Sequence, residues 1–338
     1  MVRIMLPPMR RTQAVRPSEA VPRGSEAGRV RSDEAGVALP GSKPGASSTS
    51  ATLLLPPSGP SGSGWSSIGP FMVCPQRWAY RNLLGIGCDG SPAMTLGSAV
   101  HLALAAHYLR VQAKQKGQDP DVYAHPRDVA AIAIQRGELP DMDDEAWRRY
   151  SRVLDAVIPK REYEAYTIVA VEDTLPISVG TLRAPGHPQD GQPITYAPRL
   201  DLVVQDKKGR YWIRDHKTAS VPSKARVAYA LHGQFLAMRQ IGRVRYGQNF
   251  GGAQLHLIQT IPPYNVELVD LPSTPAADAQ IKQVLFEAFT RRALLEVETA
   301  RGERSAWNWP KAYDELTCYH RYGQCFGWDY CCWGAERH

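Results

Sequence analysis

The sequence predicts a mixed α/β fold in which a central β-sheet is flanked by helices. In several long stretches apolar residues recur every three to four positions, the pattern of amphipathic helices. Elsewhere, short runs rich in β-branched and aromatic residues lie between turn residues, as strands do. The order is helices, then successive strands, then helix, strand and helix, which favours a sheet with helices packed on its faces.

The composition is that of a globular protein with a core of ordinary size. Of 338 residues, 43% are hydrophobic and 22% are charged. No stretch approaches the ~18 consecutive apolar residues of a membrane helix, and Pro7 and Pro8 interrupt the apolar run near the start, so we expect neither a membrane span nor a signal peptide. The net charge of +7 permits nucleic-acid binding without predicting it, because the basic residues are not concentrated in one folded segment.

Residues 1–64 differ from the rest of the chain. They contain nine Pro, eight Gly and ten Ser, and no aromatic residue. Such a segment cannot bury enough apolar surface to offset its chain entropy. We therefore predict a disordered tail over residues 1–64 and one folded domain over residues 65–338.

The expected elements follow in chain order. A short helix rich in aromatic residues lies within 66–84, and a longer helix covers 95–114, where Leu96, Val100 and Leu104 share one face. The other expected helices are 126–136, 143–158, 228–242 and 275–300. The expected strands lie within 166–179, 198–205, 210–219, 253–261 and 264–271.

The strands 198–205 and 210–219 form a predicted hairpin with unusual charges. Gly209 suits the left-handed position of its turn. Asp215 and Lys217 are two residues apart on a strand, so they share a face, and a turn at 206–209 puts Asp201 opposite Asp215 to within one residue. Carboxylates in so apolar a hairpin need compensation, which Mg²⁺ supplies well. The alternative is a surface hairpin with an ordinary Asp–Lys salt bridge, because this spacing alone is weakly specific.

Four segments together resemble the RecB-like branch of the PD-(D/E)XK nuclease superfamily. They are GSAVH (97–101), RLDLVV (199–204), IRDHKT (213–218) and HGQFLAM (232–238). The resemblance covers roughly residues 65–338 in the expected order. It implies a restriction-endonuclease-like core with a central mixed β-sheet flanked by helices, and a metal-dependent nuclease activity.

The resemblance also implies roles for individual residues. His101, Asp201 and Asp215 would bind Mg²⁺ or Mn²⁺ together with a backbone carbonyl near His216. Lys217 would position the attacking water. Gln234 would contact the substrate or Lys217.

Two further positions bear on this resemblance. Many relatives have Tyr four residues after the Gln, where this chain has Met238, and Met cannot donate a hydrogen bond. Glu172 lies where the family often has a strand glutamate.

The cysteines form a second candidate site. Cys318, Cys325 and Cys331 lie close together near the C-terminus, and three thiolates need a fourth ligand. The resemblance extends to an iron–sulfur subset of the family, which includes AddB-type, CRISPR-associated and phage enzymes. It implies a [4Fe–4S] cluster held by Cys74, Cys318, Cys325 and Cys331. The alternatives are Zn²⁺ in the same four thiolates, or ordinary buried cysteines.

Two cysteines remain beside this set. Cys332 could replace Cys331 as a ligand, and Cys88 is expected to be a free structural thiol. Aromatic and basic residues interleave at 76–81 and 319–330, a pattern that suits stacking on single-stranded DNA or shielding of a cluster from solvent.

These observations predict a Mg²⁺- or Mn²⁺-dependent deoxyribonuclease that acts in recombination, repair or phage DNA processing. The family's typical action on DNA ends favours an exonuclease. The alternative is a catalytically silent DNA-binding or assembly module with the same fold and metal cluster. The expected partners are single-stranded DNA or DNA ends, and a helicase or recombination partner. Unwinding is expected to come from another chain, since the motif G-x-x-x-x-G-K-[ST] is absent. We expect a cytoplasmic protein, bacterial or phage-encoded, that does not bind a membrane.

Overall fold

The structure is a computed structural model, and it describes most of the chain beyond residue 52. The described residues are 53–57, 61–86, 91–158, 165–230, 232–271, 275–312, 318–320, 323–327 and 330–331. Most of the expected tail, together with Cys88 and Cys332, lies outside the described residues. Before residue 65, Leu54 forms a bridge with Tyr123 and Ser63 forms one with Ala197.

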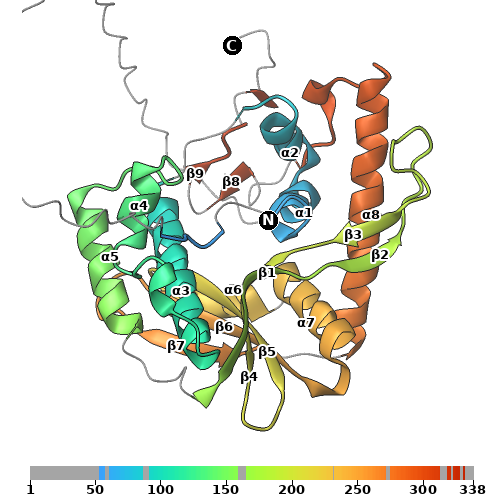
Figure 1. Ribbon diagram of the computed structural model, residues 1–338. Coiled ribbons are helices and arrows are strands. Elements are labelled where there is room, and N and C mark those ends of the chain that lie inside the picture. Colours follow the sequence, from blue (N-terminus) through green and yellow to red (C-terminus); the bar gives the residue numbers. More distant parts are fainter. Residues whose placement is uncertain are drawn as a thin grey trace, which may run out of the picture. The chain divides into compact units, whose positions relative to one another are not determined.

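A five-stranded mixed sheet lies at the centre of the described elements (Figure 1). In spatial order its strands are β1 (Thr167–Thr174), β4 (Arg199–Gln205), β5 (Tyr211–Ala219), β6 (Phe250–Gln259) and β7 (Val266–Asp270). β5 and β6 are parallel, whereas the other neighbours are antiparallel. The prediction of a mixed α/β fold with a central sheet flanked by helices is confirmed.

Three helices cover one face of the sheet. They are α3 (Pro92–Gln115), α4 (Val129–Gln135) and α5 (Asp144–Val157). Their apolar side chains form one core with Leu202 and Val204 of β4 and Ile258 of β6. Ser91 caps α3 by accepting a hydrogen bond from the Met94 amide, and Pro92 occupies the first turn, where its missing N–H costs nothing.

A second core lies on the opposite face, because neighbouring strand residues point to opposite sides. Val203 of β4 and Leu257 of β6 pack there with Phe235 and Met238 of α7 (Gly233–Tyr246). The helix expected over 228–242 is two helices, α6 (Pro222–Ala230) and α7. His232 begins α7, with its Nδ1 accepting a hydrogen bond from the Gln234 amide at 3.4 Å.

A third core joins the two ends of the described chain. Helices α1 (Trp65–Val73) and α8 (Pro275–Ala300) pack with a small hairpin of β2 (Ile177–Thr181) and β3 (Pro193–Tyr196), seen beside α8 in Figure 1. Strand β3 was not expected from the sequence. The fully buried Asp278 of α8 accepts hydrogen bonds from Arg239 and Arg243 of α7, at 2.7 and 2.8 Å, and so ties the two helices together.

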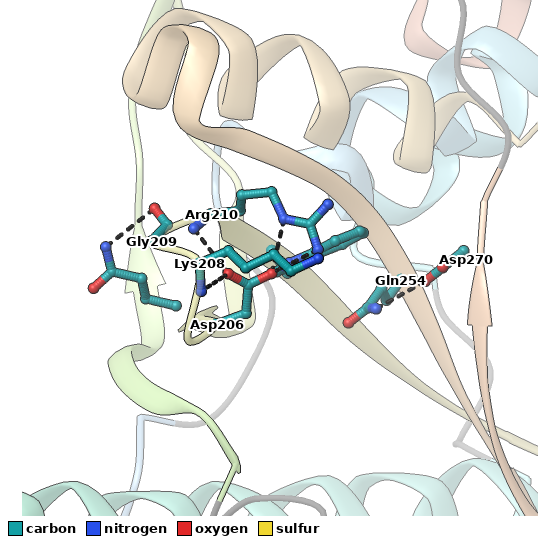
Figure 2. Close-up of polar contacts among 8 residues, drawn as sticks. Asp206, Lys208, Gly209, Arg210, Gln254 and Asp270 are labelled. Atoms are coloured by element: carbon teal, nitrogen blue, oxygen red, sulfur yellow. Dashed lines mark hydrogen bonds and ion pairs between the residues drawn. The ribbon is translucent and has the colours of Figure 1, made fainter.

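The Asp206 side chain makes several of the hydrogen bonds that shape the turn between β4 and β5, as Figure 2 shows. The Asp206 carboxylate accepts hydrogen bonds from the amides of Lys208 and Arg210, at 2.9 and 3.0 Å, and from the Trp212 indole at 3.1 Å. Gly209 has the predicted left-handed backbone, with φ of +77°. This turn sets the register in which Leu202 pairs with Arg214, so Asp201 comes beside Asp215.

The remaining elements are short. They are α2 (Pro75–Asn82), the 3₁₀ turns η1 (Pro120–Val122), η3 (Gly247–Asn249) and η4 (Ala306–Asn308), and the strand pair β8 (Tyr319–His320) and β9 (Gly323–Gln324). Among the described residues, no helix combines the length and apolarity needed to cross a membrane.

Candidate active site

The first part of the site comes from α3. Gly97 faces β5, and a Cβ atom on this residue would lie 3.0 Å from the Thr218 hydroxyl oxygen. The absence of a side chain therefore lets α3 approach the strand closely. One helical turn later, His101 places Nδ1 3.5 Å from Oδ2 of Asp201.

The second part comes from the hairpin of β4 and β5. Asp215 is 1% exposed, and it forms an ion pair with Lys217 on the same face of β5. Gln234, in the first turn of α7, donates a hydrogen bond from Nε2 to Oδ1 of Asp215 at 2.8 Å. The backbone N–H of His216 donates to Oδ2 of Asp201 at 2.7 Å. The structure thus brings together the side chains that were expected to act together: His101, Asp201, Asp215, Lys217 and Gln234.

Glu172 is a further carboxylate at this site, and it was not among the predicted site residues. Its neighbours on β1 pair with β4 as Val171 with Leu202 and Asp173 with Leu200, so Glu172 faces Asp201 across the strands. Its backbone φ is +50°, a value that costs energy for a residue other than glycine. Arg199 forms an ion pair with it at 2.8 Å. The signal in the sequence was its position in a strand where the family often has a glutamate.

The basic residues beside these carboxylates do not balance the cost of burying their negative charges. Burial raises the pKa of Glu172 to about 8, and the charges of Asp201 and Asp215 add to this while Arg199 opposes it. Burial likewise raises the pKa of Asp215 to about 7, with Asp201 adding to the shift and Lys217 opposing it. Both pKa values lie well above those of ordinary carboxyl groups, which is the behaviour of a site with more buried negative charge than its own cations balance.

The pKa values of the two nitrogen bases at the site, Lys217 and His101, are shifted in opposite directions. Burial disfavours the Lys217 ammonium, but the carboxylates of Asp215 and Asp201 outweigh it and raise the pKa of Lys217 to about 12. Burial lowers the pKa of His101 despite the neighbouring Asp201. Lys217 is therefore a cation, and His101 is a neutral imidazole with a lone pair to offer.

The donor set fits a divalent cation. Three carboxylates and one neutral imidazole converge at the junction of β1, β4, β5 and α3, and oxygen ligands of this kind suit Mg²⁺ and Mn²⁺. Two of the carboxylates are engaged by Arg199 and Lys217. In the described part of the chain, no group of three or more His, Cys, Asp or Glu side chains is placed so that it could hold a metal ion.

Tyr229 of α6 is another residue that the sequence analysis missed. The Lys217 Nζ atom lies 5.9 Å from the centroid of its ring, within the range of a cation–π interaction. Met238, which stands where many relatives have Tyr, is 1% exposed in the core beneath α7. An aromatic side chain therefore reaches the lysine from α6 and not from α7.

The cysteines also approach one another. Cys74, Cys318, Cys325 and Cys331 are all free thiols. The Tyr80 hydroxyl lies 3.6 Å from Sγ of Cys331. Burial raises the pKa of the Cys331 thiol, and the charges of Cys74 and Cys325 act in the same direction, so all three sulfurs lie within electrostatic range. The Cys325 amide donates to the Cys318 carbonyl at 2.8 Å, which brings Cys318 to the same segment.

Comparisons with known proteins identify the family of this chain. The family described as the PD-(D/E)XK nuclease superfamily matches residues 65–308. One similar solved structure is a candidate exonuclease from Eubacterium rectale, with 12% sequence identity, a TM-score of 0.44, and coverage of 77% of this chain and 88% of that one. No curated protein matches the chain.

Proposed function

Because this chain belongs to the PD-(D/E)XK nuclease superfamily, we propose that it is a metal-dependent deoxyribonuclease that hydrolyses phosphodiester bonds at DNA ends. The observation that carries the proposal is the convergence of Asp201, Asp215 and Lys217 on one patch of the sheet, with Glu172 and His101 beside them. Structural ion-pair networks also bury charged groups, but in them each charge is balanced by a partner. Here the pKa values of Glu172 and Asp215 are raised, to about 8 and about 7, although each carboxyl has a basic partner.

The carboxylates of Glu172, Asp201 and Asp215 would hold the cation, with His101 and the His216 backbone carbonyl as further donors. A bound Mg²⁺ or Mn²⁺ would supply charge stabilisation to the phosphate and lower the pKa of a water. Gln234 orients Asp215 through its amide hydrogen bond.

Lys217 is the residue that acts on the attacking water and the phosphate. The neighbouring carboxylates raise the pKa of Lys217 in the metal-free protein to about 12, so it is a hydrogen-bond donor and a positive charge there. It therefore orients the water and stabilises the negative charge that develops on the phosphate oxygens. Asp215 and the Tyr229 ring hold the ammonium in position for this task.

The test is cleavage of end-labelled single- and double-stranded DNA in Mg²⁺, in Mn²⁺ and in EDTA. We expect metal-dependent cutting that falls by about 100-fold or more in Lys217→Ala, because a preorganised charge at the reacting phosphate is removed. Lys208→Ala is the matched control, since this exposed lysine lies in the turn of the same hairpin. The product ladder distinguishes exonuclease from endonuclease.

Two results would count against this function. Equal activity in the wild type and Lys217→Ala would place the reaction elsewhere. No cutting by folded protein with either metal would favour the alternative, a DNA-binding or assembly module that works with a separate helicase or recombination partner.

We also propose that Cys74, Cys318, Cys325 and Cys331 hold a [4Fe–4S] cluster, with Zn²⁺ as the alternative metal. What supports it is that Cys74, from one end of the domain, and Cys325, from the other, both influence the pKa of the Cys331 thiol. The cluster would have a structural role. The aromatic rings of Tyr80, Trp307 and Tyr330, with centroids 5.5 to 5.7 Å apart, would exclude water from it.

A further inference from the structure

A pair of buried histidines joins the two parallel strands behind the candidate active site. His216 of β5 is the register partner of His256 of β6, and their Nδ1 atoms lie 2.8 Å apart. Each residue is 2% exposed. Two ring nitrogens at this distance form a hydrogen bond only when one carries a proton and the other offers a lone pair. The two rings therefore hold complementary protonation states at Nδ1.

The ring of His216 is also held by α3. Tyr108, which is fully buried, stacks on it with centroids 5.3 Å apart and planes 18° apart. His101 precedes Tyr108 on the same face of α3 and meets His216 edge-on, with centroids 6.0 Å apart. A stacked ring, an edge contact and a hydrogen bond together leave His216 little freedom to change rotamer.

The backbone of His216 carries this constraint to the active site. Its N–H donates the 2.7 Å hydrogen bond to Oδ2 of Asp201, the same oxygen that lies 3.5 Å from His101. A side chain fixed on the α3 face of β5 thus fixes the peptide unit that orients a candidate metal ligand. Any tilt of β5 at this residue would move the N–H and release the carboxylate.

The pair is not needed to fill the core. Two residues further along β6, on the same face, Ile258 packs among the apolar side chains of α3 and α5. An aliphatic residue at position 256 would suit the same surroundings without the desolvation of two imidazoles. A buried polar pair in such a place is a candidate for a positional role.

We propose that His256 is a positioning residue for the metal site: its hydrogen bond to His216 fixes the peptide N–H that orients Asp201 toward a divalent cation. This inference rests on the proposed function. It assigns a role to a residue that contacts neither the metal nor the substrate.

The test compares three substitutions of His256 in the full chain. The side-chain amide of Asn lies close to the position of Nδ1 in His256, whereas the amide of Gln lies further from the backbone. Leu cannot form the hydrogen bond. Mn²⁺ binding to the DNA-free protein is measured from the electron paramagnetic resonance signal of free Mn²⁺. We expect His256→Leu and His256→Gln to weaken binding by about tenfold or more, as loss of outer-sphere partners does, and His256→Asn to retain most of it.

Gln254→Leu is the matched control. Gln254 lies two residues earlier on the same face of β6, and it accepts a hydrogen bond from the buried Arg214 at 2.7 Å. Its loss should lower the melting temperature as much as His256→Leu does but leave Mn²⁺ affinity unchanged. If His256→Leu does not fold, the contrast between Asn and Gln still decides the question.

The outcomes separate this inference from the proposed function. Wild-type affinity in folded His256→Leu and His256→Gln, or an equal loss in Gln254→Leu, would overturn the positioning role. A wild-type protein that neither binds Mn²⁺ nor cuts DNA would overturn the proposed function instead. Hydrogen exchange of the His216 backbone amide still tests the positioning role in that case, because it needs no metal. We expect faster exchange in His256→Leu than in Gln254→Leu, and equal rates would contradict the positioning role.

Discussion

Burial among other carboxylates raises the pKa of Glu172 in the metal-free protein, so this carboxyl keeps a proton to higher pH than an ordinary one. Its pKa rises from an ordinary value of 4.5 to about 8, so the folded chain binds a proton that the unfolded chain has released. Stability from such a group is present at low pH and is lost as the pH rises through the folded pKa. The raised pKa of Asp215, about 7, acts in the same direction.

This predicts that metal-free protein becomes less stable as the pH rises from about 5 to about 8, between the unfolded and folded pKa of Glu172, and that the slope levels off above this range. Glu172→Gln, which mimics the protonated form, should flatten the slope and be more stable than the wild type at the upper end by about 1 kcal/mol. Urea unfolding in EDTA at several pH values measures this.

Added Mg²⁺ should stabilise the wild type at high pH more than it stabilises Glu172→Gln. Glu267→Gln is the control, since this carboxylate is exposed and pairs with Arg226 at the surface. An unchanged slope in Glu172→Gln would mean that another group carries the titration.

At the scale of elements, the approach of α3 to β5 decides where His101 lies. Gly97 provides the close contact, with only 3.0 Å available between an added Cβ and the Thr218 hydroxyl. Alanine elsewhere inside a helix would stabilise it by roughly 0.5–1 kcal/mol relative to glycine. At position 97 this gain in helix propensity is opposed by the cost of moving α3 away from Thr218.

We predict that Gly97→Ala lowers nuclease activity severalfold by moving His101 away from Asp201. The double substitution Gly97→Ala/Thr218→Ala should restore activity and be more stable than Thr218→Ala alone by about 0.5–1 kcal/mol. A double-mutant cycle on activity and unfolding free energy tests this coupling. Additive losses of activity in the double variant would show that the contact does not position the helix.

At the scale of the whole domain, the proposed cluster would connect cysteines that are far apart in sequence. Cys74 lies at the junction of α1 and α2, whereas Cys325 and Cys331 follow the last long helix. Joining such distant points restricts the unfolded chain strongly, since loop-closure entropy grows with loop length. A cluster here would stabilise the domain without taking part in hydrolysis.

Cys74→Ser should therefore lose the brown colour and bound iron of anaerobically purified protein and lower its melting temperature. Lys217→Ala should keep both, because the nuclease residues lie on the sheet. Metal analysis of the wild type checks the prediction. Colourless protein with bound zinc would favour the alternative metal, and wild-type iron content in Cys74→Ser would exclude Cys74 as a ligand.

The sequence by itself determined the features that depend on near neighbours. Periodicity predicted the mixed α/β fold, and the turn at 206–209 predicted the register that brings Asp201 beside Asp215. The spacing of Asp215 and Lys217 placed both on one face. The roles proposed for these residues remain predictions.

Only the tertiary structure decided the contacts between distant segments. The division into α6 and α7, the aromatic contact of Tyr229 with Lys217, and the position of Glu172 each depend on how separate elements pack. The pairing of His216 with His256 requires the register of two parallel strands joined by helices, which no local pattern encodes. Local periodicity fixes which face a side chain occupies, whereas packing of the whole chain fixes what it meets there.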